Sequence, residues 1–248
     1  MNPPLQNKVV LVTGGARRVG AAIARRLHAA GARIAIHYRG SEDDAVALEA
    51  ALNALRPDSA ARFRADLLAA DAPAALVMDV SARLGGIDGL VNNASLFYPT
   101  PMGSIGMHQW DELMGSNVRA PLFLSQAAAP LLAAARGAIV NIVDIHAERP
   151  LKDYPVYSAA KAALAGLTRA LAVELAPAVR VNGVSPGAIV WPEDGQFDPA
   201  ERERVLASTP LARVGGAEEI AQAVQYLLEA QYVTGQILAV DGGRSVYL

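Results

Sequence analysis

The chain has 248 residues, a length at which one α/β domain built on a single sheet is more common than two domains. Its 22 Lys and Arg residues and 24 Asp and Glu residues give a net charge of -2, so no overall positive field attracts nucleic acid or an anionic membrane surface. The chain contains no cysteine, which excludes disulfides and thiolate metal sites.

The start of the chain has neither the charged region nor the apolar region of a signal peptide, and no apolar run reaches the length that we expect of a membrane span. The four histidines show no metal-ligand spacing, so no metal site is predicted. We therefore expect a cytoplasmic protein that acts on a small molecule, with no nucleic-acid or membrane partner.

The first predicted element is an apolar run over residues 8–13, which is typical of a buried parallel strand. Apolar residues then recur at every fourth position over 19–30, which predicts a helix that ends at Gly31. Strand and helix patterns continue to alternate, and this order indicates one doubly wound (Rossmann) parallel sheet with helices on both faces. Further strands are predicted over 33–38, 87–92, 137–143, 179–185 and 236–240, and further helices over 43–55, 69–83, 108–135, 157–175 and 218–229.

The turn after the first strand reads Thr13-Gly14-Gly15-Ala16-Arg17-Arg18-Val19-Gly20. Glycine allows the tight turn and the close helix packing that expose N–H groups at a helix N-terminus to a pyrophosphate. Two arginines in the first helical turn are disfavoured by the helix dipole unless an anion lies there, although they could also be solvated at a loop tip. The dinucleotide-binding candidates in this turn are Gly14, Arg17, Arg18, Val19 and Gly20.

The end of the second strand indicates which dinucleotide binds. An Asp or Glu at this point would accept hydrogen bonds from the ribose 2′-hydroxyl of NAD, and none occurs before Glu42. Arginine suits bidentate contact with a 2′-phosphate, so we expect NADP(H) as the cofactor. The candidates for this contact are Arg39 and Ser41, with His37 nearby, and Tyr38 is a further candidate for cofactor binding.

Polar residues also follow the next two strands. Asp66, followed by Leu67, could accept a hydrogen bond from the adenine amino group, or it could be an ordinary exposed loop residue. Asn93, Ala94 and Ser95 end the fourth strand, at the carboxyl edge where ligands bind in such sheets.

The run from Tyr157 to Lys161 carries the predicted chemistry. Residues four apart on a helix lie on one face, and a nearby ammonium favours the phenolate form, so we expect Lys161 to lower the pKa of Tyr157. Asp144, thirteen residues before the tyrosine, adds a second titratable group that could hold the phenol or share its proton. The group predicts reduction chemistry.

Together these residues resemble the short-chain dehydrogenase/reductase family over essentially the whole chain. By this resemblance Tyr157 is the general acid, Lys161 also binds the nicotinamide ribose, and Asn117 helps to hold a proton-relay water. The resemblance also places Pro186 and Gly187 at the cofactor. The matching segments are 13–20, Asn92-Asn93-Ala94, Asn117, Tyr157 with Lys161, Pro186-Gly187 and Val240-Asp241-Gly242-Gly243.

Two departures from the common family pattern resemble its pteridine reductase branch. Asp144 stands where a catalytic serine is usual, and Arg18 stands at the middle glycine of the turn. A serine hydroxyl suits a developing alkoxide, whereas reduction of a pterin C=N bond requires a proton on a ring nitrogen. The branch is also matched by the runs 37–41 and 92–101 and by Tyr154, and its bacterial members by 186–195.

The predicted substrate is a dihydropterin or dihydrofolate. Phe97 would stack on one face of its ring, while Arg18 and Ser95 would bind its polar edge and a cofactor phosphate. Tyr154 would line the same pocket, with a packing role as the alternative, and the sequence does not choose among individual pterins. The segment 188–210 is either a lid or a plain surface insertion; the roles of Trp191 and His146 stay open.

Two other functions remain open. A carbonyl or 3-oxoacyl reductase of the same family is the first alternative, and the carboxylate of Asp144 counts against it. A dinucleotide-binding regulator without catalysis is the second, and the complete set of Tyr157, Lys161 and Asn117 counts against it. The resemblance implies a homotetramer with helix 157–175 at an interface, although the small residues on that helix would equally suit a contact within the chain.

Overall fold

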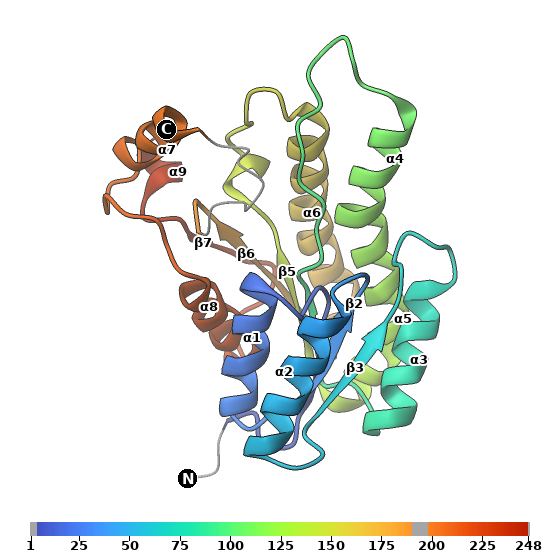
Figure 1. Ribbon diagram of the computed structural model, residues 1–248. Coiled ribbons are helices and arrows are strands. Elements are labelled where there is room, and N and C mark those ends of the chain that lie inside the picture. The colour runs from blue at the N-terminus through green and yellow to red at the C-terminus, as the bar shows by residue number, and fades with distance from the viewer. Residues whose placement is uncertain (1–3, 190–197, 248) are drawn as a thin grey trace.

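The structure is a computed structural model, and it describes residues 4–189 and 198–247. Seven strands of this part of the chain form one parallel sheet in the order β3-β2-β1-β4-β5-β6-β7 (Figure 1). The doubly wound parallel sheet predicted from the sequence is therefore confirmed. The strands are β1 (Val9–Val12), β2 (Arg33–Tyr38), β3 (Ala60–Arg64), β4 (Gly89–Asn92), β5 (Ala138–Ile142), β6 (Arg180–Pro186) and β7 (Ile237–Val240).

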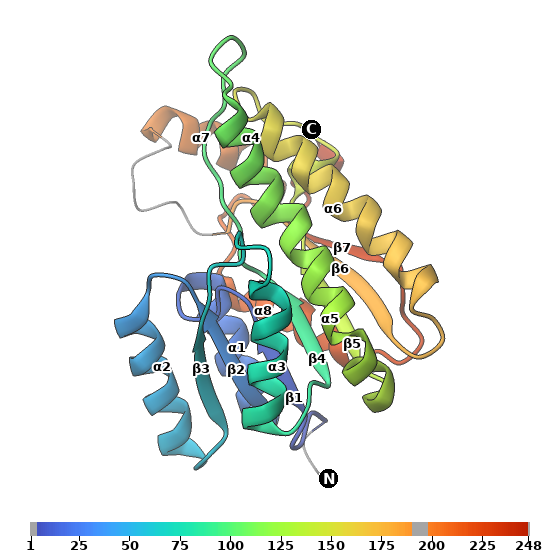
Figure 2. The ribbon, with the colours of Figure 1, turned by 90° about the vertical axis from the view of Figure 1, so that its right-hand side faces the viewer.

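Helices cover both faces of this sheet, as Figure 2 shows from the side of α3 and α5. A short π-helical turn, Gly115–Arg119, joins two of them into one continuous stretch, and a 3-10 turn, Ile145–Ala147, follows β5. The α-helices are α1 (Arg18–Ala29), α2 (Glu42–Leu55), α3 (Ala72–Leu84), α4 (Met107–Met114), α5 (Ala120–Ala135), α6 (Pro155–Glu174), α7 (Pro199–Ala207), α8 (Ala217–Glu229) and α9 (Arg244–Tyr247).

Alternate residues of β1 enter two separate cores, because successive side chains of a strand point to opposite faces of the sheet. Val10 and Val12 pack in a cluster that includes buried residues of α1, α2 and α8. Val9 and Leu11 pack in a second cluster with residues of α3 and α5. Both faces of the sheet are therefore buried, which explains why its strands are nearly continuous apolar runs.

The strand order reverses between β1 and β4, and a crevice at the carboxyl ends of strands is the usual ligand site at such a point. The turns after β1, β2, β4 and β5 all open at this edge because all of the strands are parallel. The fold thus brings together the glycine turn, the Arg39 loop, the Asn93 loop and Asp144.

The helices differ from the sequence prediction in two places. The helix predicted over 69–83 begins at Ala72, because a turn precedes it and a proline in its first turn fixes the start. The segment 188–210, predicted to be either a lid or a plain surface insertion, contains α7, which begins with a capping box between Asp198 and Glu201. Trp191, whose role the sequence left open, lies outside the described residues.

The stretch Met107–Ala135 is long and apolar enough to cross a membrane by length and composition alone, contrary to the expectation from the sequence. In the fold α5 packs against α3, β4 and β5, and α4 packs against α6. The stretch therefore forms part of the helical layer that covers one face of the sheet.

Candidate active site

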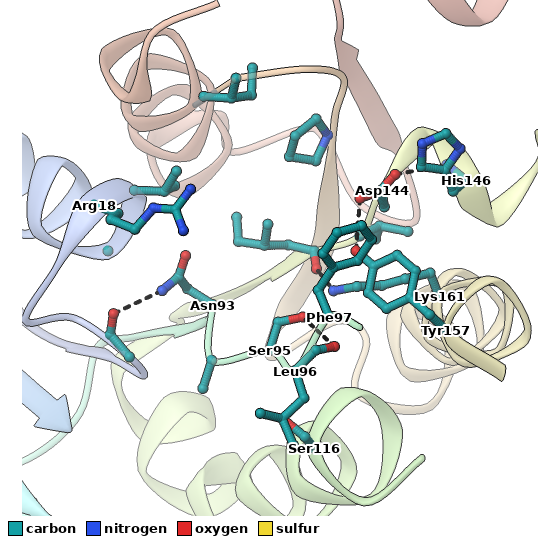
Figure 3. Close-up of a pocket in the computed structure, with 18 of the residues that line it drawn as sticks. Arg18, Asn93, Ser95, Leu96, Phe97, Ser116, Asp144, His146, Tyr157 and Lys161 are labelled. Carbon is teal, nitrogen blue, oxygen red and sulfur yellow. Dashed lines mark hydrogen bonds between the residues drawn. The ribbon is translucent and has the colours of Figure 1, made fainter. Parts of the chain in front are cut away.

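A cavity of about 690 Å³ opens at the carboxyl edge of the sheet, and Figure 3 shows part of its lining. Its walls come from the loops after β1, β2, β3, β4, β5 and β6 and from α6, α7 and α9. Most of the residues that the sequence singled out meet here. Those that line it are Gly14, Arg17, Arg18, Val19, Gly20, His37, Arg39, Asp66, Leu67, Asn93, Ala94, Ser95, Phe97, Asp144, His146, Tyr157, Lys161, Pro186 and Gly187.

The glycine turn packs so closely against the Asn93 loop that side chains would not fit. Gly14 has a positive φ of 58°, and a Cβ on Gly20 would lie 2.0 Å from the Gly14 carbonyl oxygen. The Asn93 side chain donates to the carbonyls of Thr13 and Gly14 at 2.8 and 3.1 Å. The turn is therefore held ready for a ligand that approaches its backbone.

Arginines surround the turn on the cavity side. Arg17 and Arg18 both line the cavity, and Arg18 has a φ of 50°, the left-handed conformation that favours glycine at this point. The Arg17 guanidinium also lies 3.5 Å from the carboxylate of Asp44, so part of its charge is offset within the protein. Figure 3 shows Arg18 beside Asn93, across the pocket from Asp144.

The end of β2 supplies fewer ligand contacts than the sequence predicted. His37 accepts a hydrogen bond from the Gly14 N–H at 3.1 Å and donates from its other ring nitrogen to the Ala65 carbonyl at 3.2 Å. Burial lowers its pKa to about 4, so it is neutral near pH 7 and brings no charge to the cavity that it lines; its contact with the cofactor stays a prediction. Its role is to hold the glycine turn against β2.

Arg39 remains the exposed cation at the end of β2, and it lines the cavity. Tyr38 is buried in the core with residues of α1 and α2, and it is not among the residues that line the cavity. Ser41 precedes α2 and is likewise absent from the cavity wall. Asp66 is exposed at the cavity, and one of its oxygens accepts from the Leu68 N–H at 3.1 Å.

The candidate catalytic pair lies at the other side of the cavity (Figure 3). The Tyr157 hydroxyl donates to Asp144 Oδ2 at 2.8 Å, and Asp144 Oδ1 accepts from the His146 backbone N–H at 2.8 Å. Both oxygens of the carboxylate are thus fixed, one by the 3-10 turn after β5 and one by the first turn of α6. The juxtaposition predicted from the thirteen-residue spacing is present.

The electrostatics of this pair differ from the sequence prediction. Burial raises the pKa of Tyr157 well above its ordinary value, the neighbouring Asp144 adds to the shift, and a hydrogen bond with Ser95 acts in the opposite direction. The Lys161 ammonium donates to the Ile142 carbonyl at 2.9 Å and lies 5.6 Å from the centre of the tyrosine ring. The prediction that Lys161 lowers the pKa of Tyr157 was therefore wrong for this structure; the phenol keeps its proton.

Lys161 is itself perturbed. Burial lowers its pKa to about 8, and the Asp144 carboxylate only partly offsets this effect. An ammonium at this depth needs an anionic or hydrogen-bonding partner, and the Ile142 carbonyl supplies one of its contacts. Its position beside Tyr157 at the cavity wall suits a contact with a ligand hydroxyl.

Asn117 lies in the π-helical turn between α4 and α5, a feature that often marks functional positions. Its side chain donates to the carbonyls of Leu96 and Leu113, each at 3.0 Å, and accepts from the Ser95 hydroxyl at 2.7 Å. The buried amide therefore orients the loop that carries Ser95 and Phe97. The relay water implied by the family resemblance stays a prediction.

Phe97 stands at the cavity wall with two aromatic neighbours. Its ring stacks on Tyr154 with centroids 4.7 Å apart and meets the edge of Tyr157 at the same separation. Tyr154 is buried behind Phe97 and is not among the residues that line the cavity, so the predicted pocket contact of Tyr154 was wrong. It supports the Phe97 ring instead, which was the alternative role.

Arg244 and Val205 also line the cavity, although the sequence singled out neither. Arg244 begins α9, immediately after the Asp241-Gly242-Gly243 run that follows β7, and Val205 belongs to α7. A signal for Arg244 was available, because a charged residue just beyond the carboxyl end of a parallel strand lies at the ligand edge. Val205 had no comparable signal, since α7 itself was missed.

Residues 14–245 match the profile of the family described as enoyl-(acyl carrier protein) reductase. The chain is 41% identical to pteridine reductase 1 of Leishmania tarentolae, with 96% of each chain covered. It is 34% identical to a 3-oxoacyl-(acyl-carrier-protein) reductase of Staphylococcus aureus, covering 95% of this chain and 97% of the relative. A crystal structure of a blue fluorescent protein from a metagenomic library, in complex with NADPH, is similar with a TM-score of 0.91 and 37% identity, covering 98% of this chain and 99% of the other.

Proposed function

The chain belongs to the short-chain dehydrogenase/reductase family, and we propose that within it the protein is an NADPH-dependent pteridine reductase. The proposed substrate is a dihydropterin or dihydrofolate, reduced at a ring C=N bond. One observation carries the proposal: the Tyr157 hydroxyl donates to a carboxylate, Asp144, at 2.8 Å. The 41% identity to a pteridine reductase supports it.

The proposed cofactor is NADP(H), and the residues at the glycine turn fit it. A Cβ on Gly20 would lie 2.0 Å from the Gly14 carbonyl oxygen, so glycine at this position allows the first turn of α1 to pack against the glycine turn that lines the cavity. Arg17, Arg18 and Arg39 bring three positive charges to this end of the cavity, which suits the pyrophosphate and a 2′-phosphate. The likeness to a protein that binds NADPH supports the same choice.

The bound cofactor supplies a hydride to the ring carbon, and the adjacent ring nitrogen must then take up a proton. Tyr157 holds that proton at a raised pKa until negative charge develops on the nitrogen, and it then donates it. Asp144 orients the phenol, and the pair takes up one proton from solvent in each cycle to replace the one that is donated. Phe97 offers a flat apolar surface for the ring, backed by Tyr154.

A 3-oxoacyl reductase is the second candidate, because a relative with that activity matches over nearly the whole chain. Its chemistry places developing negative charge on a carbonyl oxygen, which a hydrogen-bond donor stabilises. An ionised carboxylate at residue 144 has no proton to donate to that oxygen, and the phenol already donates to it. The proposal therefore ranks ketone substrates second.

The proposed assembly is a homotetramer in which α6 contributes to an interface. Small residues on this helix are exposed in the single chain: Ala159 and Ala170 face solvent, and a Cβ on Gly166 would meet nothing within 4 Å. Because the face is open, a contact within the chain does not explain its composition. Light scattering of the purified protein tests this part of the proposal.

The activity is tested by the rate of NADPH oxidation with separate substrates. We expect turnover with 7,8-dihydrobiopterin and 7,8-dihydrofolate and at most slow turnover with a 3-oxoacyl thioester or a simple ketone. Turnover of the thioester with none of either pterin would replace the proposed function with the second candidate. Tight NADPH binding with no turnover of any substrate would instead favour a protein without catalysis.

A further inference from the structure

Arg244 brings a positive charge to the substrate side of the cavity, away from the glycine turn. It begins α9, directly after β7, the edge strand of the sheet. The strands β4, β5 and β6 separate β7 from β1, which leads into the glycine turn. Asp144 follows β5, so in the strand order Arg244 and Asp144 both lie on the β4 side of β1. The dinucleotide phosphates proposed at Arg17, Arg18 and Arg39 therefore do not account for this fourth arginine of the cavity.

The guanidinium is held in place by α7. Its Nε donates to the Ser208 hydroxyl at 3.1 Å, and that hydroxyl donates in turn to the Val205 carbonyl at 3.0 Å. Both Val205 and Arg244 line the cavity, and Arg244 is half-buried. Within residues 4–189 and 198–247, Arg244 makes no ion pair, and its terminal nitrogens have no hydrogen-bond partner.

The two carboxylates that act electrostatically on Arg244 are Asp144 and Asp241, and both already accept hydrogen bonds from other groups. Asp241 accepts from the backbone N–H groups of Gly243 at 2.9 Å and Ser245 at 2.6 Å. Asp144 accepts from Tyr157 and from the His146 backbone. Both carboxylates favour the charged form of Arg244, although burial lowers its pKa overall. The remaining donors of Arg244 are thus left to a ligand.

Apolar side chains line the same cavity as Arg244, a combination that suits an apolar group that ends in an anion. Leu151 and Val205 line the cavity with it, and His146 lies on the turn after Asp144. A half-buried guanidinium whose terminal donors lack hydrogen-bond partners costs free energy, and an anion bound there would offset that cost. A planar guanidinium binds a carboxylate through two parallel hydrogen bonds.

We propose that Arg244 is a specificity residue that binds the carboxylate at the end of the substrate's ring substituent, so that dihydropterins with a carboxylated tail, as in dihydrofolate, are preferred over those with a neutral tail. This proposal rests on the proposed function, because it assumes that a pterin ring lies between Phe97 and Asp144. It adds a residue that neither the family resemblance nor the relatives assign.

The test compares wild type, Arg244→Gln and Ser208→Ala on 7,8-dihydrofolate and 7,8-dihydrobiopterin, with NADPH oxidation as the readout. We expect the KM for dihydrofolate to rise at least about tenfold in Arg244→Gln, since a hydrogen-bonded charged contact is lost. The kcat with dihydrofolate and the KM for dihydrobiopterin should change less than about threefold. Ser208→Ala, which leaves the charge but frees the guanidinium, should give a smaller rise in the same direction. Arg213→Gln is the matched control, because Arg213 is exposed and pairs with Glu219 outside the cavity.

An equal rise in KM for both substrates, or none for dihydrofolate, would overturn the role of Arg244. Dihydroneopterin monophosphate is assayed as a third substrate, and a rise in KM confined to it would also overturn the role, because the charge would then belong to a phosphate contact. Equilibrium binding of folic acid to the NADP-loaded protein separates this proposal from the proposed function. If wild type reduces no pterin yet binds folic acid at least about tenfold more tightly than Arg244→Gln, the proposed function fails and the anion contact stands.

Discussion

Replacing Asp144 with asparagine removes the charge that the Tyr157 hydroxyl contacts and leaves the shape of the side chain nearly unchanged. The Tyr157 hydroxyl oxygen lies 2.8 Å from Asp144 Oδ2, and Asp144 Oδ1 accepts a hydrogen bond from the His146 backbone N–H. An amide oxygen can still accept one of these hydrogen bonds, but the amide group cannot share or return a proton. The variant should therefore fold and bind NADPH while it loses proton transfer.

The size of the loss follows from the hydrogen bond. A hydrogen bond to a charged group contributes about 1.5–3 kcal/mol, which corresponds to a decrease in kcat/KM of roughly 10- to 150-fold. Burial and Asp144 together raise the pKa of Tyr157, so the substitution removes part of that rise and also leaves the buried phenol less well oriented. We expect the decrease in kcat, with the KM for NADPH within about twofold of wild type.

The assay is steady-state NADPH oxidation with 7,8-dihydrobiopterin, together with a direct NADPH titration of each protein. Glu148→Gln is the matched control, because Glu148 is an exposed acid near the same turn that pairs only loosely with Arg169, at 3.9 Å. The reasoning fails if Asp144→Asn keeps more than half of the wild-type kcat. It also fails if NADPH binding is lost in parallel with turnover.

Three further predictions address other parts of the cavity. Phe97→Leu should raise the KM for dihydrobiopterin about 2- to 10-fold through lost stacking and leave NADPH binding unchanged; an equal effect of Phe123→Leu, outside the cavity, would argue against this. Gly20→Ala should abolish NADPH binding in a titration, because its Cβ would lie 2.0 Å from the Gly14 oxygen, whereas Gly40→Ala, with open space around it, should bind normally. The pKa of His37 is lowered to about 4 from 6.5, so the folded state binds fewer protons than the unfolded state in this window and stability falls as pH falls. Urea unfolding at pH 7 and pH 5 should show about 2 kcal/mol less pH dependence in His37→Gln than in wild type, and parallel pH dependences would contradict the assignment.

The sequence predicted the sheet and most of the ligand edge because both depend on local patterns. Apolar runs, glycine turns and the four-residue spacing of Tyr157 and Lys161 each have a direct geometric meaning. The meeting of Asp144 with Tyr157 followed from the parallel sheet, since the ends of neighbouring elements lie at one edge.

The differences from the sequence prediction concern how deeply a side chain is buried and which of several nearby groups it contacts. His37 is polar and near the proposed phosphate in sequence, yet both of its ring nitrogens bind the backbone. Lys161 was expected to act on the Tyr157 hydroxyl, but it donates to the Ile142 carbonyl. The Tyr154 ring is buried against Phe97 and does not line the cavity. None of these choices can be made from spacing alone.

The helix α7 was missed although a local signal existed. Asp198 is followed by a proline and then by Glu201, the pattern of a capping box with proline in the first turn, and both reciprocal hydrogen bonds form. Few apolar residues follow, so the periodicity that predicted the other helices was weak here. Without α7, the contact between Ser208 and Arg244 could not be anticipated.

The central claim is that the acid at residue 144 makes this reductase act on a C=N bond in a flat ring. A competition assay tests it most directly: wild-type protein and NADPH are mixed with equal concentrations of 7,8-dihydrobiopterin and a 3-oxoacyl thioester, and both products are measured. The product ratio equals the ratio of the two kcat/KM values. The account predicts that tetrahydrobiopterin forms in excess by at least about a hundredfold. A mixture dominated by the 3-hydroxyacyl product would contradict it.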